Sequence, residues 1–171
     1  MLKPDLKYSG PELLSLAVAS LFGTGFLPKM PGTFGSAAAL LLLLLPVSNI
    51  HLVLAAAGVI GFGLGLAVVP DWCNDECRDP SFVVIDEAAA MWLVLASPLV
   101  PHTWLWLLVA FGLFRLFDIW KPYPIGMIEK RKGALAVMSD DMMAALYTSV
   151  CLHLFYYLYL ALPLLVLFFS R

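Results

Sequence analysis

Long apolar stretches separated by short polar turns occupy most of the chain. Residues 50–69 and 103–117 approach or reach the roughly 17–25 apolar residues that a helix needs to cross a ~30 Å hydrocarbon core. A membrane barrel would instead show alternating segments of about ten residues, whereas these runs are continuous and rich in Leu and Ala. The pattern therefore predicts an all-α protein whose helices span a membrane.

The apolar runs define the elements of the predicted fold. We expect about five crossings, near residues 34–49, 50–70, 82–100, 103–120 and 141–162. Turn signals separate them, at residues 46–49, 71–80, 98–102 and 122–126. The segment 12–27 is apolar all round but only sixteen residues long, so a short span, a re-entrant helix and a surface-lying helix all remain open. The prediction is a polytopic transmembrane helical bundle that forms a single domain over residues 1–171.

Composition supports a membrane protein and argues against some functions. The 171 residues are 62% hydrophobic and 13% charged, far from the fractions typical of soluble domains. The net charge is −2 and no long run of like charge occurs, so nothing indicates nucleic-acid binding. The first apolar stretch lacks a basic region leading into a small-residue cleavage site, so we expect no cleaved signal peptide.

Basic residues set the expected orientation, because short cytoplasmic loops collect Lys and Arg. With the N-terminus inside and segment 12–27 not crossing, Arg115 would lie just within the membrane near the cytoplasmic face, and Arg171 alone would lie outside. The other basic residues all fall inside: Lys3, Lys7, Lys29, Arg78, Lys121, Lys130, Arg131 and Lys132. The same topology brings all twelve Asp and Glu residues to the cytoplasmic side, which the rule for basic residues does not require.

Five of the acidic residues abut or enter an apolar helix, where a carboxylate without a partner is costly to desolvate. They are Asp86, Glu87, Asp118, Asp140 and Asp141. The remaining seven, among them Asp71, are interpreted as solvated loop residues. Capping of a helix start remains an alternative role for Asp86–Glu87, and for Asp140 or its neighbour Ser139. The expected topology places these carboxylates at three helix ends, at the same depth on the same side of the membrane. Because Mg²⁺ is held by carboxylates together with phosphate oxygens, the group suits a magnesium phosphate site.

Two cationic residues lie close to one of these carboxylates. Arg115, Asp118 and Lys121 repeat every three residues and are expected to share one helix face, which Pro122 and Pro124 then terminate. A stripe of charges snorkelling at the membrane boundary, with an internal ion pair, remains an alternative. The cations would supply countercharge for a phosphate dianion.

A small-residue segment precedes the expected helix at 34–49. Residues 28–36 contain Gly32, Thr33, Gly35 and Ser36, which can turn backbone N–H groups toward an anion at a helix N-terminus. Small residues also allow close helix packing in membranes, and both interpretations remain open. The segment is not a Walker A loop.

Taken together and in this order, the motifs resemble the phosphatidylglycerophosphatase A family of bacterial membrane enzymes. The matching motifs lie between about residues 23 and 145: Pro31-Gly32-Thr33-x-Gly35-Ser36, Asp86-Glu87, Arg115-x-x-Asp118-x-x-Lys121-Pro122 and Asp140-Asp141. Ala90 and Ala145 stand where the family pattern has glycine. The resemblance implies Mg²⁺-dependent removal of the terminal phosphate of phosphatidylglycerophosphate, which yields phosphatidylglycerol. It also implies a multi-pass protein of the bacterial cytoplasmic (inner) membrane, acting on a phospholipid at the cytoplasmic leaflet.

The resemblance and the motif chemistry together assign expected roles. Lys121 is expected to join the catalytic group and, with Arg115, to bind the substrate phosphate, while Gly32, Thr33 and Ser36 contact the head group. Mg²⁺ is expected to be held, directly or through water, by Asp86, Glu87, Asp118, Asp140 and Asp141. Attack by water or by a carboxylate, the number of Mg²⁺ ions and the oligomeric state remain open.

Two other functions compete with this one. A cation transporter also needs carboxylates in the membrane, but no acidic residue lies near an expected midplane. A CDP-alcohol phosphotransferase is also acidic and Mg²⁺-dependent, but its Asp-Gly start with later spaced aspartates is missing. We therefore expect a phosphatase.

Overall fold

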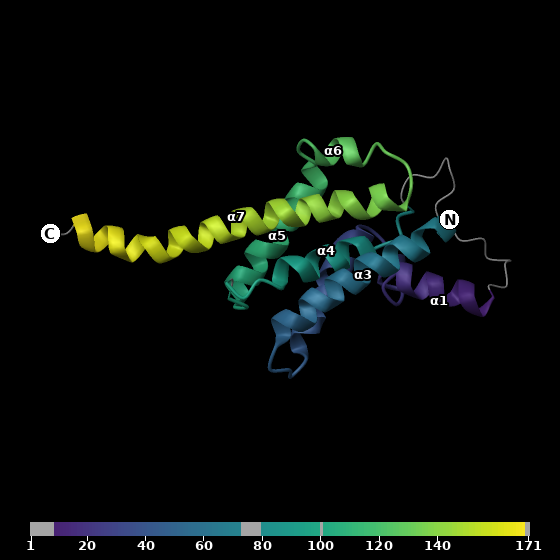
Figure 1. The fold of residues 1–171 in the computed structure, drawn as a ribbon, viewed down its shortest axis with the longest axis horizontal. Coiled ribbons are helices and arrows are strands. Elements are labelled where there is room, and N and C mark those ends of the chain that lie inside the picture. Colours follow the sequence, from purple (N-terminus) through teal and green to yellow (C-terminus); the bar gives the residue numbers. More distant parts are fainter. Residues whose placement is uncertain (1–8, 73–79, 100, 170–171) are drawn as a thin grey trace.

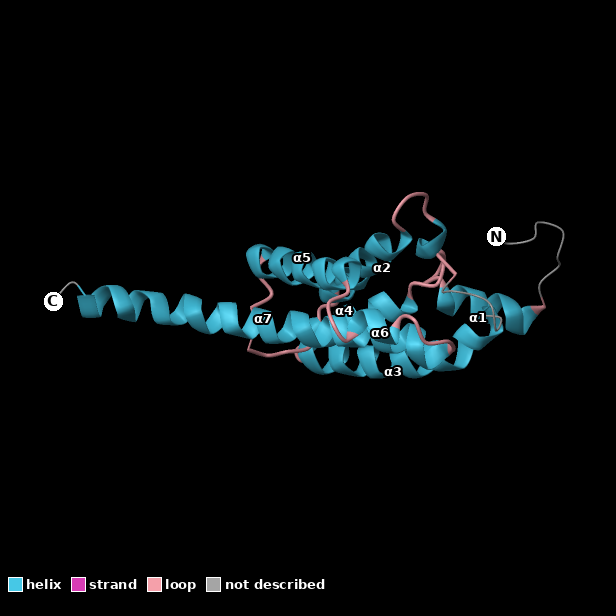
Figure 2. Cartoon of the chain, turned by 90° about the horizontal axis from the view of Figure 1, so that it is seen from above, coloured by secondary structure: helices cyan, strands magenta, loops and turns pink. Residues whose placement is uncertain are grey.

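A computed structural model describes residues 9–72, 80–99 and 101–169. Within these ranges all regular structure is helical and no strand occurs (Figures 1 and 2). Short 3₁₀ helices lie at Thr24–Phe26 and Leu40–Leu44. The described ranges contain seven α helices: α1 (Gly10–Ala19), α2 (Pro31–Ala39), α3 (Ile50–Trp72), α4 (Ile85–Leu95), α5 (Trp104–Trp120), α6 (Ile125–Ile128) and α7 (Ala134–Phe169). The prediction of an all-α fold is confirmed.

Helices α3 and α7 are long and apolar enough to cross a membrane. The qualifying segments are Ile50–Trp72, with a mean hydropathy of 2.5, and Ala134–Pro163, with 1.4. Only 28% and 17% of their most apolar windows are buried inside the protein, so most of their apolar side chains face outward. A core helix of a soluble protein would be mostly buried, and this exposure instead suits a lipid environment.

Other expected crossings are shorter in the structure than the apolar runs suggested. Helix α2 has nine residues and passes into a 3₁₀ helix, and α4 has eleven residues. At 1.5 Å per residue these α helices are only about 14–17 Å long, compared with a hydrocarbon core of ~30 Å. Helix α5 matches its expected range closely. The apolar runs at 34–49 and 82–100 thus include irregular segments that hydropathy alone does not distinguish from helix.

The segment 12–27 does not form one continuous helix. Helix α1 has ten residues and ends where Leu21 and Phe22 adopt positive φ angles, of 46° and 55°. The helix is held against α3, because the Ser15 hydroxyl donates to Asp71 Oδ2 (2.7 Å) and accepts from Trp72 Nε1 (3.0 Å). Asp71 thus lies in the last turn of α3 and not in a solvated loop.

Helix α4 lies at the centre of the bundle and contacts α2, α3, α5 and α7 (Figure 1). Eight of its eleven residues are buried, including Ala88, Ala89 and Ala90. Helix α3 meets α4 through glycines. If Gly58 carried a Cβ atom, this atom would overlap the Leu93 side chain, and a Cβ atom at Gly61 would lie 3.1 Å from Ala89 Cβ. Small residues on both helices therefore allow the close backbone approach that packs apolar helices in membranes.

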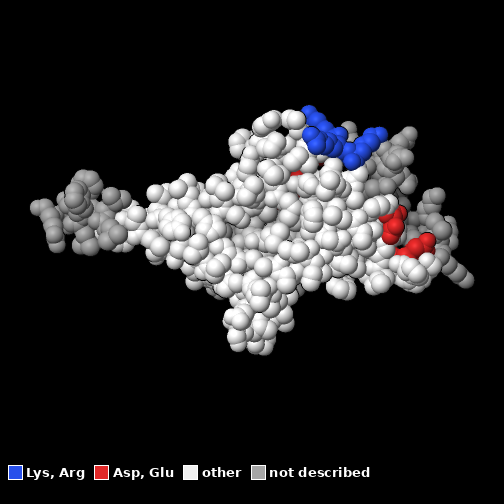
Figure 3. Space-filling view, viewed as in Figure 1, with Lys and Arg blue, Asp and Glu red and all other residues white. Residues whose placement is uncertain are grey.

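This packing brings the charged helix ends together. The start of α4, the end of α5 and the start of α7 lie at the same end of the bundle, and the distal half of α7 projects away from it (Figure 1). Much of the visible surface carries neither Asp, Glu, Lys nor Arg, and the visible charges gather toward one end (Figure 3). Lys3, Lys7, Arg78, Asp75, Glu76, Asp79 and Arg171, which figured in the expected orientation or as loop residues, lie outside the described residues.

Candidate active site

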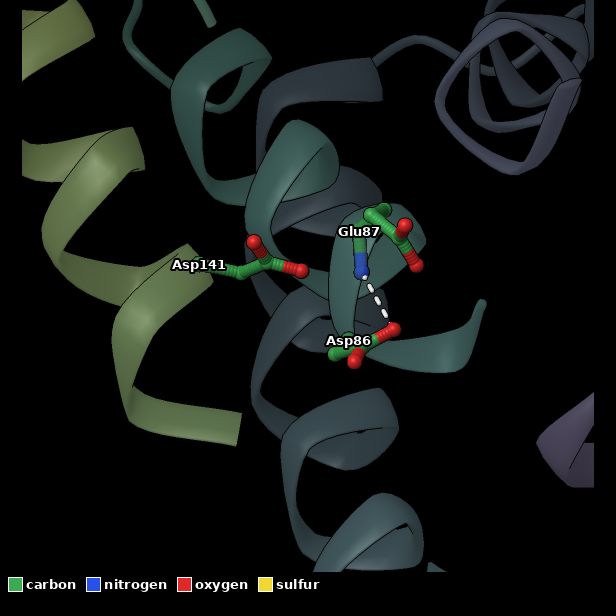
Figure 4. Close-up of side chains that lie close together, drawn as sticks. All are labelled: Asp86, Glu87 and Asp141. Carbon is green, nitrogen blue, oxygen red and sulfur yellow. Dashed lines mark hydrogen bonds between the residues drawn. The ribbon is translucent and has the colours of Figure 1, made fainter. Parts of the chain in front are cut away.

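Three carboxylates from two helices meet inside the bundle. Oxygens of Asp86, Glu87 and Asp141 lie within 4.8 Å of one another. Asp86 and Asp141 are only 2% and 4% exposed. Figure 4 shows Asp141 projecting from α7 toward the first turn of α4. Like charges this close and this well removed from water repel strongly, so the arrangement favours a bound cation.

The local structure of α4 places two of these carboxylates at its N-terminus. Helix α4 begins at Ile85 after Val84, which makes no side-chain capping hydrogen bond. Asp86 Oδ1 instead accepts the N–H of Glu87 at 2.9 Å, which satisfies one unpaired donor of the first turn (Figure 4). Helix-dipole stabilisation and a binding role can coexist in Asp86, because it also offers a carboxylate oxygen to the acidic cluster.

Asp140 and Asp141 are not helix caps. The alternative in which Ser139 or Asp140 caps the start of the last helix is excluded, because α7 begins at Ala134 and both aspartates lie inside it, about two turns from its start. The helix starts earlier because Gly133 takes a positive φ of 99° and its carbonyl accepts the N–H groups of the first turn. Helical periodicity then directs Asp141 toward α4, and its carboxylate lies beside those of Asp86, Asp118 and Asp140.

Arg115 and Asp118 form an ion pair on α5, as in the alternative interpretation of this charged stripe. Arg115 Nη1 lies 2.7 Å from Asp118 Oδ2, and the two side chains are 16% and 13% exposed. The guanidinium keeps binding capacity, since its buried Nε has no hydrogen-bond partner among the described residues. Such a donor next to a carboxylate cluster suits a phosphate oxygen.

Lys121 does not continue the helical stripe. Helix α5 ends at Trp120, and Lys121 adopts a left-handed conformation (φ 47°, ψ 59°) with its N–H donating to Phe117 O. Its ammonium lies 2.9 Å from Asp140 Oδ2 and 2.9 Å from Glu129 Oε1. Although burial opposes its charge, these bonds raise the pKa of Lys121 above its ordinary value, so it is cationic at neutral pH. Strained backbone of this kind is concentrated at functional sites.

Glu129 contacts this group although the sequence did not single it out. It directly follows α6 and precedes three exposed basic residues, a context typical of a solvated loop. Its pairing with Lys121 depends on how the turn at Pro122 and Pro124 folds back. The only signal in the sequence was a carboxylate a few residues beyond that turn.

Helix α2 contributes its small residues to the opposite side of the site. The helix begins at Pro31, so Gly32, Thr33, Gly35 and Ser36 lie inside it and not ahead of it. A side-chain carbon at Gly32 would overlap Glu87 Oε1 and lie 3.2 Å from Arg115 Nη1. One at Gly35 would lie 2.7 Å from Val84 Cβ, so close helix packing accounts for Gly35.

The two hydroxyl groups of α2 differ in availability. Ser36 Oγ donates to Gly32 O at 2.8 Å and is fully buried, so its proton is already used within the helix. Thr33 Oγ1 is buried and has no hydrogen-bond partner among the described residues. Because unpaired buried hydroxyls are unfavourable, Thr33 is the better placed of the two to bind a ligand.

The charges of the site do not balance within the protein. Five predicted carboxylates and Glu129 accompany only two cations, Arg115 and Lys121, and these cations pair with Asp118, Asp140 and Glu129. The cluster of Asp86, Glu87 and Asp141 could therefore hold a divalent cation. Fold and site together define a class of helical proteins that have membrane-length helices and, at one end of the bundle, an acidic cluster that could hold a metal ion.

Comparison with known proteins identifies the family within this class. The model of the family "Phosphatidylglycerophosphatase A" matches residues 17–156, and the chain belongs to this family. It is 34% identical to phosphatidylglycerophosphatase A of Escherichia coli over 88% of this chain and 87% of that protein. It is 36% identical to the Haemophilus influenzae protein of the same name, over 75% of this chain and 80% of that protein. The chain is thus an enzyme of the phosphoric monoester hydrolase class.

A third relative has a different name. A Bacteroides thetaiotaomicron protein named "Putative phosphatidylinositol-3-phosphatase" is 36% identical, over 82% of this chain and 92% of that protein. Both names denote lipid phosphate monoesterases, but they differ in the alcohol that carries the phosphate. No solved structure matches the chain significantly.

Proposed function

We propose that this protein is a Mg²⁺-dependent phosphatase that hydrolyses phosphatidylglycerophosphate to phosphatidylglycerol and inorganic phosphate at the cytoplasmic leaflet. The observation that carries the proposal is the buried carboxylate cluster of Asp86, Glu87 and Asp141 beside two cationic side chains. A phosphate monoester needs cations for its charge, and an excess of carboxylates needs a metal ion to complement it. Membership of the family agrees with both needs.

The residues present fit Mg²⁺. They offer carboxylate oxygens, the hard ligands that this ion prefers, and three of them converge from two helices. Asp86, Glu87 and Asp141 would hold the ion, with Asp118 and Asp140 contributing through their remaining oxygens or through water. When bound, Mg²⁺ supplies Lewis-acid polarisation of the phosphoryl group and lowers the pKa of bound water.

The protein's own groups have separate tasks around the substrate. Arg115 and Lys121 bind phosphate oxygens and stabilise the charge that develops on them during transfer. The Thr33 hydroxyl and the N-terminus of α2 orient the head group, and Gly32 lets Glu87 and Arg115 lie close against α2. A carboxylate of the cluster accepts the proton of the attacking water. The helices packed around α4 exclude bulk water, which strengthens each of these interactions.

The site's place at one end of the bundle supports action at a membrane surface. Three exposed basic residues, Lys130, Arg131 and Lys132, lie beside the site and favour a cytoplasmic location for this end. The protein would then be a single-domain, multi-pass protein of the bacterial inner membrane, with α3 and α7 crossing it. Crossings by the shorter helices, and with them a total of about five, stay a prediction.

Phosphate release from phosphatidylglycerophosphate by the purified protein in detergent with Mg²⁺ tests the proposal. Asp118→Asn and Asp140→Asn should each abolish release while the protein stays folded. Asp71→Asn is the matched control: it removes a carboxylate at the same end of the bundle but still accepts the Ser15 hydrogen bond. Retained activity in both site variants would overturn the assignment.

The same assay distinguishes competing functions. Phosphatidylinositol 3-phosphate offered in parallel tests the specificity suggested by the Bacteroides relative's name, and faster release from it would replace the proposed substrate. Ion flux in vesicles without phosphate release would favour a transporter. Formation of a new lipid from a CDP-alcohol and a second alcohol would favour a phosphotransferase.

A further inference from the structure

The ammonium of Lys121 holds two carboxylates that differ sharply in burial. Asp140 Oδ2 and Glu129 Oε1 each lie 2.9 Å from Nζ. The Asp140 side chain is 11% exposed and that of Glu129 is 53% exposed, with Lys121 between them at 23%. Lys121 therefore has one permanent partner on the protein side and one loosely held partner on the solvent side.

Little besides Lys121 holds the Glu129 carboxylate in place. Glu129 directly follows the four-residue helix α6, and its N–H donates to Ile125 O. Within the described residues its carboxylate has this one ion pair, and the next three residues, Lys130 to Lys132, are exposed. An exposed ion pair of this kind contributes little to stability and exchanges readily with other anions.

A substrate phosphate needs the position that Glu129 occupies. Lys121 already faces two carboxylates, so a dianion that approached without displacing one of them would meet a net negative charge. The Asp140 carboxylate is buried and cannot leave at low cost. A carboxylate and a phosphate accept the same charge-assisted hydrogen bonds from a lysine.

We propose that the Glu129 carboxylate holds the place of the substrate's phosphate on Lys121 and is displaced when a phosphate monoester enters. The inference rests on the proposed function, because it takes Lys121 as a ligand of the transferred phosphate. The same competition lets the site select phosphate monoesters over phosphodiesters. A monoester carries about −1.5 to −2 charges at pH 7 and competes well for the lysine, whereas a phosphodiester carries one and competes poorly. Glu129 thereby helps to keep the diester product, and other diester lipids, out of the site.

Glu129→Gln tests the inference in the full-length protein. Removing the competing charge should lower KM for phosphatidylglycerophosphate roughly two- to fivefold, the range that an exposed ion pair supports. It should leave kcat within about twofold, because the groups around the reacting phosphate are retained. Added phosphatidylglycerol should inhibit the variant more strongly than the wild type. Glu12→Gln is the matched control, since Glu12 is an exposed carboxylate on α1 whose capping box accepts either residue.

A second measurement does not depend on turnover. Inorganic phosphate should stabilise the protein against heat at lower concentrations in Glu129→Gln than in the wild type, by a similar factor. A raised KM or a reduced kcat would show that Glu129 positions Lys121, and unchanged KM and phosphate affinity would show that it does not compete; either result overturns the inference. If the wild type releases no phosphate from the lipid, the proposed function fails, while the phosphate titration still decides the role of Glu129.

Discussion

The backbone of Gly32 lies so close to Glu87 that a single added carbon would overlap the Oε1 atom of its carboxylate. The same carbon would lie 3.2 Å from Arg115 Nη1. Helices α2, α4 and α5 thus meet at one point, where two opposite charges face a residue without a side chain. The glycine sets the position of a carboxylate that belongs to the site.

Gly32→Ala should reduce phosphate release far more than it reduces stability. The Glu87 carboxylate is the end of a flexible side chain and can rotate away from a methyl group, so the fold tolerates the change. A displaced ligand, however, costs roughly 10- to 100-fold in rate when it moves by about 1 Å. Activity and melting temperature of the variant measure the two effects. Gly63→Ala on α3 is the control, because nothing lies within 4 Å of the added carbon, and equal activity losses in both variants would contradict the prediction.

Gly25→Ala should show the opposite pattern. A side-chain carbon there would overlap the backbone carbonyl oxygen of Phe82, two residues before the N-cap of α4, and backbone cannot rotate aside. Overpacking of this kind destabilises by about 1–3 kcal/mol. Thermal unfolding in detergent should therefore show a lower midpoint than for Gly32→Ala. A midpoint equal to that of the wild type would show that the 80–84 segment adapts freely.

Asp141→Asn should change how the protein responds to Mg²⁺. The amide keeps the shape but removes one charge from a cluster whose oxygens lie within 4.8 Å of one another. The Mg²⁺ concentration for half-maximal activity should rise by at least about tenfold, the scale of losing a ligand interaction. Without Mg²⁺ the variant should be at least as heat-stable as the wild type, because repulsion among buried carboxylates is relieved. Titration of activity and of melting temperature with Mg²⁺ checks both, and an unchanged Mg²⁺ requirement would remove Asp141 from the metal site.

The ion pairs of Lys121 should stabilise the protein across a wide pH range. The pKa of Lys121 is raised in the folded state, so the contribution is complete below the ordinary value of 10.5 and is lost only as the pH rises through the raised value. The difference in unfolding midpoint between the wild type and Lys121→Met should therefore stay constant from pH 7 to about pH 10. A difference that disappears between pH 7 and 9 would mean that burial dominates and lowers the pKa. Lys121→Arg, which keeps the charge, should retain most of the difference.

The carboxylate cluster could be predicted from the sequence because the desolvation cost that reveals it depends on residues nearby in the chain. A carboxylate next to apolar residues at a helix is unfavourable unless something compensates it, and Asp86, Glu87 and Asp141 each abut an apolar run. The Arg115–Asp118 pair followed from spacing along one helix. Both features depend on residues only a few positions apart, and such patterns can be read directly from a sequence.

Other features depend on where backbone conformations change and on tertiary contacts. The start of α7 was expected seven residues too late, because residues 134–138 are small or apolar and gave no boundary apart from Gly133. The lengths of α2 and α4 were overestimated, since an apolar irregular segment and an apolar helix have the same hydropathy. The Lys121–Glu129 contact arises from a turn whose direction no periodicity encodes.

The carboxylate cluster joins parts of the chain that are made at different times. Asp86 and Glu87 enter with α4, but Asp141 enters only with α7, the last helix. A ribosome-bound chain that ends before α7 therefore carries two of the three carboxylates and lacks Asp140, the buried one of the two partners of Lys121. On the proposed function, lipid dephosphorylation by this protein would begin only after α7 has packed against α4.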